Sequence, residues 1–312
     1  GRPGGPKTGD TMKRIHLWAF FAALTVTVIA TPIAAQEGLK VYISADMEGV
    51  VGAVTSDQLG PTGFEYQTFR RIMTKEVNAA IAAARDMGAT EILVSDSHGN
   101  GENLLIEDLP QDIELIRSWP RPLMMMEGID ASFDAAIFIG YHSSTTNTRG
   151  VRAHTISSGN LTSVKLNGMP MMEASINAAI AGDFGVPVIM ISGDDAVVEE
   201  AHQIIGDMEG AVVKESLGFH SARTIMPEAA YDLIGEKVRA ALDRLDDFTP
   251  YVMDGPVSLD ISFKNYMPAE LMAYLPNVER VDSHTIRFIG VDMTEISKFI
   301  EFTTSYGVSI TP

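Results

Sequence analysis

Acidic and histidine side chains follow three stretches of the sequence that are predicted as strands. Asp46 and Glu48 come directly after the first stretch, at a spacing that places both on one face of an extended segment. His98 follows the second stretch, His142 follows the third, and Glu173 begins a predicted helix. Carboxylates and neutral imidazoles are ligands that suit Zn²⁺, and a carboxylate can bridge two ions. These five residues predict a metal site if the fold brings them together.

Each of these residues alone also has a plainer interpretation. The two acids could be solvated loop residues, His98 could lie in a turn capped by Asp96, and His142 could be a packed loop histidine. Glu173 could be a first-turn acid stabilised by the helix dipole. The five residues together favour a metal site more than any one of them does alone. Carboxylates brought together without a metal would repel one another, and two divalent ions would cancel their charge.

The pattern of elements favours such a gathering. Apolar strands alternate with an amphipathic helix and a second helical segment, which predicts an α/β fold with a mostly parallel sheet covered by helices on both faces. In such sheets ligands lie beyond the carboxyl ends of the strands. The predicted strands are 39–45, 91–95, 135–140 and 186–192, and the predicted helices are 65–87 and 173–181.

The character of the sequence changes near residue 250. Residues 257–263 and 285–289 alternate between apolar and polar types, as half-buried strands do, and residues 271–274 and 293–303 favour helix. We therefore divide the chain into an N-terminal extension with a signal peptide (1–35), a metal-binding α/β domain (36–249) and a smaller α+β C-terminal portion (250–312). The last could be a subdomain or an arm that forms an oligomer.

Residues 12–35 are typical of a secretory signal. A charged start, Met12-Lys13-Arg14, precedes an apolar stretch over 17–30 and then small residues suited to cleavage. The apolar stretch is too short for a comfortable membrane span, so we expect no stable span once the signal is cleaved; a retained anchor is the alternative. The expected location is therefore outside the cytoplasm, periplasmic or secreted.

Composition narrows the chemistry further. The 312 residues carry a formal net charge of -18, which disfavours a nucleic-acid partner. The sequence contains no cysteine, which excludes disulfides, thiolate nucleophiles and cysteine-ligated metals.

Several longer strings resemble the DppA-type D-aminopeptidases, a family of binuclear zinc metallopeptidases. These include SADMEGV, SDSHGNGENL, the segment ending in AAIFIGYHS, GVRAHTIS and LNGMPMMEASINAAIAG, in order over about 39–303. The resemblance implies two zinc ions per chain, a short peptide substrate and a ring-like homo-oligomer. By position it implies that Asp46 bridges both ions, and that Glu48, His98, His142 and Glu173 are the other ligands.

The resemblance also implies that His154 is the catalytic histidine. Nothing in its local sequence marks it, and alone it could be a polar loop residue. Chemically we favour a proton shuttle, or a donor to the tetrahedral intermediate, over a covalent nucleophile, because a metal-bridging hydroxide would make a second nucleophile unnecessary. Loop lengths on both sides of His154 depart from the family by one residue each.

Other residues are assigned plainer roles. Asp96 could orient a ligand histidine, Asp194 and Asp195 predict a strand-end turn near the site, and Asn265-Tyr266 could reach a neighbouring subunit's pocket. Surface or packing roles are expected for three histidines, and packing beneath the site for three methionines: His202, His220 and His284, and Met124, Met125 and Met126.

We therefore expect an exported zinc-dependent aminopeptidase that acts on short peptides, with N-terminal D-residues implied by the resemblance alone. Two alternatives stay open from the sequence. One is another metal-dependent hydrolase on the same site, such as an L-peptidase or an amidase. The other is a non-catalytic periplasmic protein that binds peptides or metals.

Overall fold

The computed structural model describes residues 38–307, together with Gly1, Gly5 and Gly9. The predicted N-terminal extension and signal peptide lie outside the described residues, apart from those three glycines. Residues 38–307 form one compact unit. Among the described helices, none combines the length and apolar character needed to cross a membrane.

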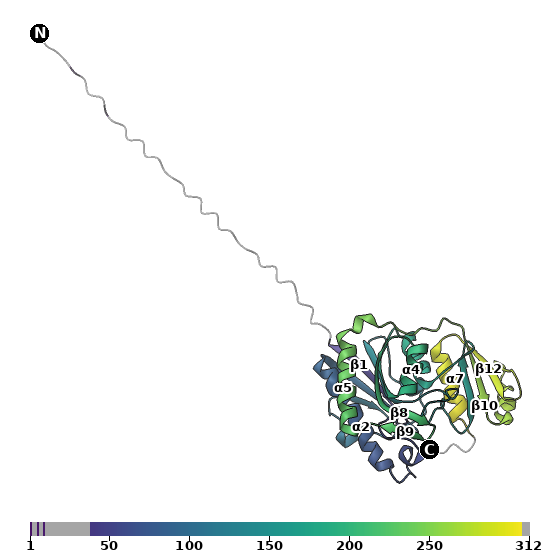
Figure 1. Cartoon of the computed structure of the whole chain (residues 1–312). Helices are drawn as coiled ribbons and strands as arrows, with labels where there is room; N and C mark the ends of the chain where they lie inside the picture. The colour runs from purple at the N-terminus through teal and green to yellow at the C-terminus, as the bar shows by residue number, and fades with distance from the viewer. Residues whose placement is uncertain (2–4, 6–8, 10–37, 308–312) are drawn as a thin grey trace. The chain divides into compact units, whose positions relative to one another are not determined.

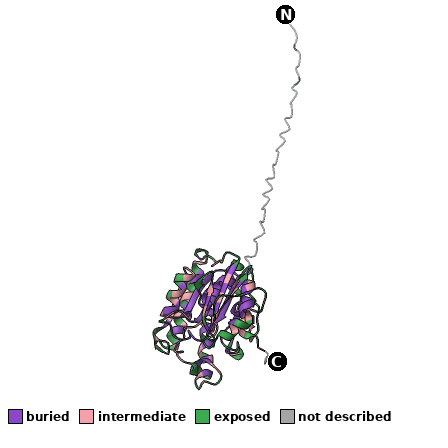
Figure 2. Cartoon of the chain, turned by 90° about the vertical axis from the view of Figure 1, so that its right-hand side faces the viewer, coloured by how far each residue is buried: buried purple, intermediate pink, exposed green. Residues whose placement is uncertain are grey.

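A seven-stranded sheet forms the centre of this unit. Its strand order is β3-β2-β1-β4-β7-β8-β9, and every neighbouring pair is parallel except the pair formed by the edge strand β9. Apolar side chains bury the central strands on both faces (Figure 2). The strands are β1 Leu39–Ala45, β2 Ala89–Asp96, β3 Glu114–Ile116, β4 Ala135–Tyr141, β7 Val188–Asp194, β8 Glu209–Gly218 and β9 Ser221–Thr224.

Helices cover both faces of this sheet (Figure 1). Helix α2 (Tyr66–Asp86) packs with α5 (Pro227–Asp243) on one face, and α3 (Glu173–Asp183) and α4 (Asp195–Ile204) contact strands β4, β7 and β8. The chain leaves β1 through α2 toward one edge, and leaves β4 through α3 toward the other. Right-handed crossovers in opposite directions place their helices on opposite faces.

The change of direction creates a switch point between β1 and β4. These strands are parallel neighbours, with Val41 beside Ala135 and Ala45 beside Ile139. A crevice opens beyond the carboxyl ends of strands at such a point and is the usual ligand site of an open α/β sheet. Asp46 and His142 are the first residues after these two strands.

A five-stranded antiparallel sheet adjoins the first. Its order is β11-β12-β10-β5-β6, and β10 has the predicted alternation of buried and half-buried side chains. The elements are β5 Leu161–Leu166, β6 Met169–Pro170, β10 Val257–Phe263, β11 Val278–Arg280, β12 Thr285–Gly290, with helices α6 Tyr266–Met272 and α7 Met293–Ser305.

The fold class predicted from the sequence is confirmed, with two differences in detail. The second sheet does not begin at residue 250, because β5 and β6 come from the middle of the chain and pair with β10. The helix expected at 271–274 is α6, which starts earlier and ends at Met272, because Asn265 caps it by accepting a hydrogen bond from the Met267 amide.

Candidate metal centre

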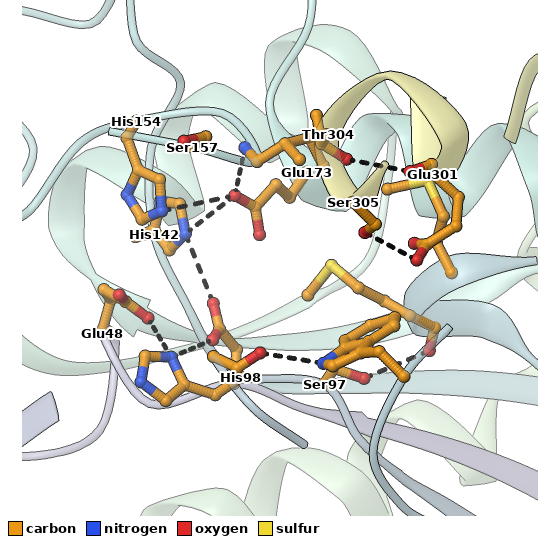
Figure 3. A pocket seen from close by; sticks show the side chains of 16 residues that line it. Glu48, Ser97, His98, His142, His154, Ser157, Glu173, Glu301, Thr304 and Ser305 are labelled. Carbon is orange, nitrogen blue, oxygen red and sulfur yellow. Dashed lines mark hydrogen bonds and ion pairs between the residues drawn. The ribbon is translucent and has the colours of Figure 1, made fainter. Parts of the chain in front are cut away.

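All six predicted site residues line one cavity of about 280 Å³ (Figure 3). They reach it from different elements, because the carboxyl ends of β1, β2 and β4 meet at the switch point. Asp46 and Glu48 follow β1, His98 follows β2, His142 follows β4, His154 lies in the loop before β5, and Glu173 is the first residue of α3.

Two glycines allow the segments after β1 and β4 to touch. A Cβ on Gly49 would lie 2.0 Å from the carbonyl oxygen of Tyr141, and a Cβ on Gly140 would lie 2.2 Å from that of Asp46. Gly140 also has a φ of +73°, and the Gly49 amide donates to its carbonyl at 2.6 Å. Only glycine fits this close approach. This contact fixes the segment with Asp46 and Glu48 against the start of the segment that carries His142.

The carboxylates and imidazoles lie close enough to one another to coordinate the same metal ion. His98 Nδ1 is 2.8 Å from Glu48 Oε2 and 3.1 Å from Asp46 Oδ1. His142 Nε2 is 3.3 Å from Asp46 Oδ2 and 3.4 Å from Glu173 Oε1. The two oxygens of Asp46 therefore face two different histidines. Two groups of residues place their ligand atoms within 4.8 Å of one another: Asp46, Glu48 and His142, and His142, His154 and Glu173.

Each imidazole has one ring nitrogen toward the carboxylates, and its second ring nitrogen contacts a backbone carbonyl oxygen. A carbonyl oxygen only accepts, so that nitrogen carries a hydrogen and the opposite nitrogen faces the carboxylates. This arrangement fixes ring orientation in metal-binding histidines. The acceptors are Leu59 for His98 Nε2 at 2.6 Å, Ser143 for His142 Nδ1 at 3.0 Å and Arg152 for His154 Nδ1 at 2.8 Å.

The three carboxylates of the cluster are buried, and together they concentrate negative charge there. Burial and the nearby Glu48 raise the pKa of Asp46 to about 7. Burial disfavours the charged form of His142, but Glu173 and Asp46 outweigh it and raise its pKa to about 10. The carboxylates therefore draw positive charge to this point, as protons on the imidazoles or as divalent cations.

Unsatisfied polar atoms support a metal rather than protons alone. Within the described part of the chain, Asp46 Oδ2, Glu48 Oε2 and His142 Nε2 are buried and have no hydrogen-bond partner; their short ion-pair contacts lack hydrogen-bond geometry. Buried polar atoms without partners are costly in free energy unless another group, such as a metal ion, satisfies them. The residues present thus fit the zinc that the sequence predicts.

His154 lies beside the cluster. Its ring stacks on that of His142 with centroids 4.0 Å apart, and its Nε2 is 3.6 Å from Glu173 Oε1. Burial and His142 lower the pKa of His154. Its loop is anchored nearby, because Asp194 accepts a hydrogen bond from the Val151 amide at 2.7 Å and also caps α4.

Comparisons with known proteins identify the family of this chain. Residues 39–302 match the D-aminopeptidase peptidase family. The chain belongs to this D-aminopeptidase family. It is 35% identical over 258 residues to a D-aminopeptidase of Bacillus subtilis (strain 168), which covers 82% of this chain and 93% of that relative. It also resembles the solved structure of the Zn-dependent D-aminopeptidase DppA from Bacillus subtilis, a self-compartmentalizing protease, with a TM-score of 0.82 and 33% identity. That match covers 88% of this chain and all of the other.

The family and the enzyme class predicted from the sequence are confirmed by these matches. Asp96, however, does not touch the His98 ring in this D-aminopeptidase. Its carboxylate accepts hydrogen bonds from the amides of Asn103 and Leu104 and from the Asn103 side chain, at 2.6 to 2.8 Å. Asp96 therefore shapes the loop that carries His98, and the Leu59 carbonyl orients the His98 ring.

Lys214 supports the site and was not singled out in the sequence. It lies on β8, fully buried, and its ammonium donates to the carbonyls of Glu48, Val50 and Ala53 at 2.6, 3.0 and 2.6 Å. All three of its donors thus hold the loop that carries Glu48. Burial lowers the pKa of Lys214 to about 8. The available signal was a lysine directly after the apolar run 211–213.

Other assignments divide into supporting and peripheral residues. Met124 and Met125 are buried and line the cavity, whereas His202 and His220 are exposed. The last turn of α7 also lines the cavity, a contribution that no local sequence feature indicated. It brings Glu301, Thr304 and Ser305.

Gly49→Ala should damage the centre. The added Cβ would meet a backbone oxygen that cannot move alone, so the segment with Asp46 and Glu48 must shift away from β4. We expect a loss of about 2 kcal/mol or more in unfolding free energy and a fall in bound zinc. Urea unfolding and elemental analysis measure both. Gly159→Ala is the matched control, because its Cβ would meet nothing within 4 Å. Unchanged zinc content in Gly49→Ala would contradict this view of the close approach.

Proposed function

We propose that this D-aminopeptidase holds two zinc ions at the switch point and hydrolyses short peptides that begin with a D-residue. The observation that carries the proposal is the convergence of three buried carboxylates and three backbone-anchored imidazoles in one cavity. A zinc-dependent relative of the same fold supports the choice of metal.

The contacts suggest how the ligands divide. Asp46 would bridge the two ions, because its two oxygens face His98 and His142 separately. Glu48 and His98 would complete one site, and His142 and Glu173 the other. When bound, zinc ions supply an acidified water and polarise the scissile carbonyl.

We infer that His154 moves a proton during hydrolysis. Its Nδ1 donates to the Arg152 carbonyl, so Nε2 carries the lone pair that faces the cavity. Nε2 can take a proton from the attacking water and pass it to the leaving nitrogen. The hydroxyl joins the acyl carbon as the peptide C–N bond breaks, and the products are a free amino acid and a shortened peptide. The backbone amide of His154, which donates to the Ser143 carbonyl at 3.0 Å, keeps the ring beside the cluster.

The cavity is small for a peptidase. Its volume of about 280 Å³ lies near the lower end of ligand pockets, which run from roughly 300 to 1,000 Å³. A short substrate fits this size better than a folded protein. The handedness of the preferred N-terminal residue depends on the shape of this pocket.

A panel of dipeptides in all stereoisomers tests the proposal directly. We expect turnover with a D-residue at the N-terminus, loss of turnover after chelation and recovery on adding zinc, with about two zinc ions per chain by elemental analysis. Turnover of L-substrates alone would instead support an L-peptidase. Fewer than one metal per chain after zinc supplementation would contradict the metal centre, and binding without turnover would support a peptide-capturing protein.

His154→Ala should separate catalysis from metal binding. The side chain is outside the proposed ligand set, so zinc content should stay near that of the unaltered protein while kcat falls by about 10²-fold or more. His202→Ala is the matched control, since His202 is an exposed histidine on α4. Unchanged turnover in His154→Ala would remove this residue from the mechanism, and loss of zinc would make it a ligand.

We also propose that the chain forms a homo-oligomer. The Bacillus subtilis relative is a self-compartmentalizing protease, which supports assembly in the family. Tyr266 at the start of α6 is half-exposed and remains a candidate contact with a neighbouring subunit's pocket.

Export is a separate proposal that rests on the sequence of residues 12–35. Cleavage of a signal there would yield a mature protein that begins near Gln36. Mass spectrometry of the protein recovered from periplasmic or secreted fractions should find that N-terminus. A full-length chain confined to the cytoplasm would contradict export.

A further inference from the structure

The cavity has a second wall, which faces the metal centre. The last turn of α7 contributes Glu301, Thr304 and Ser305, and the apolar side chains of Trp119, Met124 and Met125 also line the cavity. Figure 3 shows Glu301 on the side of the cavity away from His142 and His154. The cavity therefore presents catalytic groups on one side and a carboxylate on the other.

Glu301 is not part of the metal centre. Each of the six site residues makes an ion-pair contact with another member of the cluster, and none of these contacts includes Glu301. Glu301 is partly buried, and its Oε1 accepts a hydrogen bond from the Ser305 hydroxyl at 2.8 Å. Among the described residues, no cationic side chain makes an ion pair with it within 4.0 Å. Partial burial raises the pKa of Glu301.

The buried Arg121 lowers the pKa of Glu301 through its charge, but it donates its hydrogen bonds to other groups. The guanidinium of Arg121 donates to the Ser118 carbonyl at 2.5 Å, and to the Ser95 hydroxyl and the Asp96 carbonyl at 2.8 Å each. These bonds hold Arg121 under the loop before η2 (Met124–Met126). Glu301 therefore faces the cavity with oxygen atoms free to accept a further charged donor.

We propose that Glu301 binds the protonated α-amino group of the substrate. The inference rests on the aminopeptidase function proposed above. A peptide cleaved at its first residue offers one cation close to the scissile bond, its terminal ammonium. A partly buried carboxylate forms charge-assisted hydrogen bonds with such an ammonium group. Because the cavity is small, an ammonium held at this wall keeps the next carbonyl carbon near the metal centre.

The proposal assigns substrate selection to the C-terminal helix. Peptides with a free amino end are accepted, whereas acylated or deaminated analogues lose this contact. Ser305 then acts as a positioning residue, since its hydroxyl holds one oxygen of Glu301 and leaves the other for the ammonium.

Glu301→Gln tests this with two substrates that differ only in the amino group. The zinc-loaded full chain is assayed on D-alanine p-nitroanilide and on propionic acid p-nitroanilide. Glu301→Gln should raise KM for the first by about tenfold or more with kcat changed less than about threefold. KM for the second should not change, and zinc content by elemental analysis should match the unaltered protein.

Two further variants sharpen the result. Glu301→Asp keeps the negative charge, so its KM for D-alanine p-nitroanilide should lie between that of Glu301→Gln and that of the unaltered protein. This variant keeps the inference testable if Glu301→Gln folds poorly. Glu236→Gln, an exposed glutamate on α5, should leave both substrates unaffected.

Three outcomes would overturn the inference: an unchanged KM for the free amine, an equal loss on both substrates, or a fall in zinc content. The first would favour an amine held by the metal centre, and the other two would make Glu301 a structural residue. If the unaltered protein fails to hydrolyse D-alanine p-nitroanilide, the proposed function fails. If it succeeds and Glu301→Gln behaves identically, only the inference fails.

Discussion

The rest of the structure depends on three carboxylates that the fold holds out of water at one end of the main sheet. Asp46, Glu48 and Glu173 are all buried, and their proximity would be costly in free energy without positive charge between them. Three imidazoles face them, each fixed from behind by a backbone carbonyl. The site is thus built to hold cations in place rather than to adapt to them.

The topology explains how the three carboxylates stay close together despite their mutual repulsion. The switch point brings the ends of β1 and β4 side by side, and the glycines at 49 and 140 let their backbones come closer than any Cβ would allow. Lys214 then anchors the loop from below through three carbonyls. Rigid backbone on both sides keeps the ligands converged, because the segments that bear them cannot relax apart without breaking buried hydrogen bonds.

The sequence predicted the parts of the site that follow local rules. Asp46 and His142 directly follow apolar strands, and His98 comes two residues after the end of another. Parallel strands end at one edge of a sheet, so the convergence of these residues could be anticipated. The pairing of β5 with β10 could not, because partners almost a hundred residues apart leave no local pattern. Of the two roles considered for Asp96, capping backbone amides is the one observed, and orienting the His98 ring is not. Its position near His98 in the chain could not show which groups its carboxylate meets.

The C-terminal portion is part of the site, because the last turn of α7 lines the cavity. Helix α7 packs on α3, and its first amide, at Met293, donates to Asp183 at the end of α3. Ser297 donates to the Pro122 carbonyl, which ties α7 to the segment just before η2. The element that begins with Glu173 thus also supports the helix that bears Glu301. In the proposed mechanism, metal binding and recognition of the substrate's amino end are therefore set by two ends of one packed unit. In this arrangement, changes in α7 would alter which peptides are accepted while the ligand set stays the same.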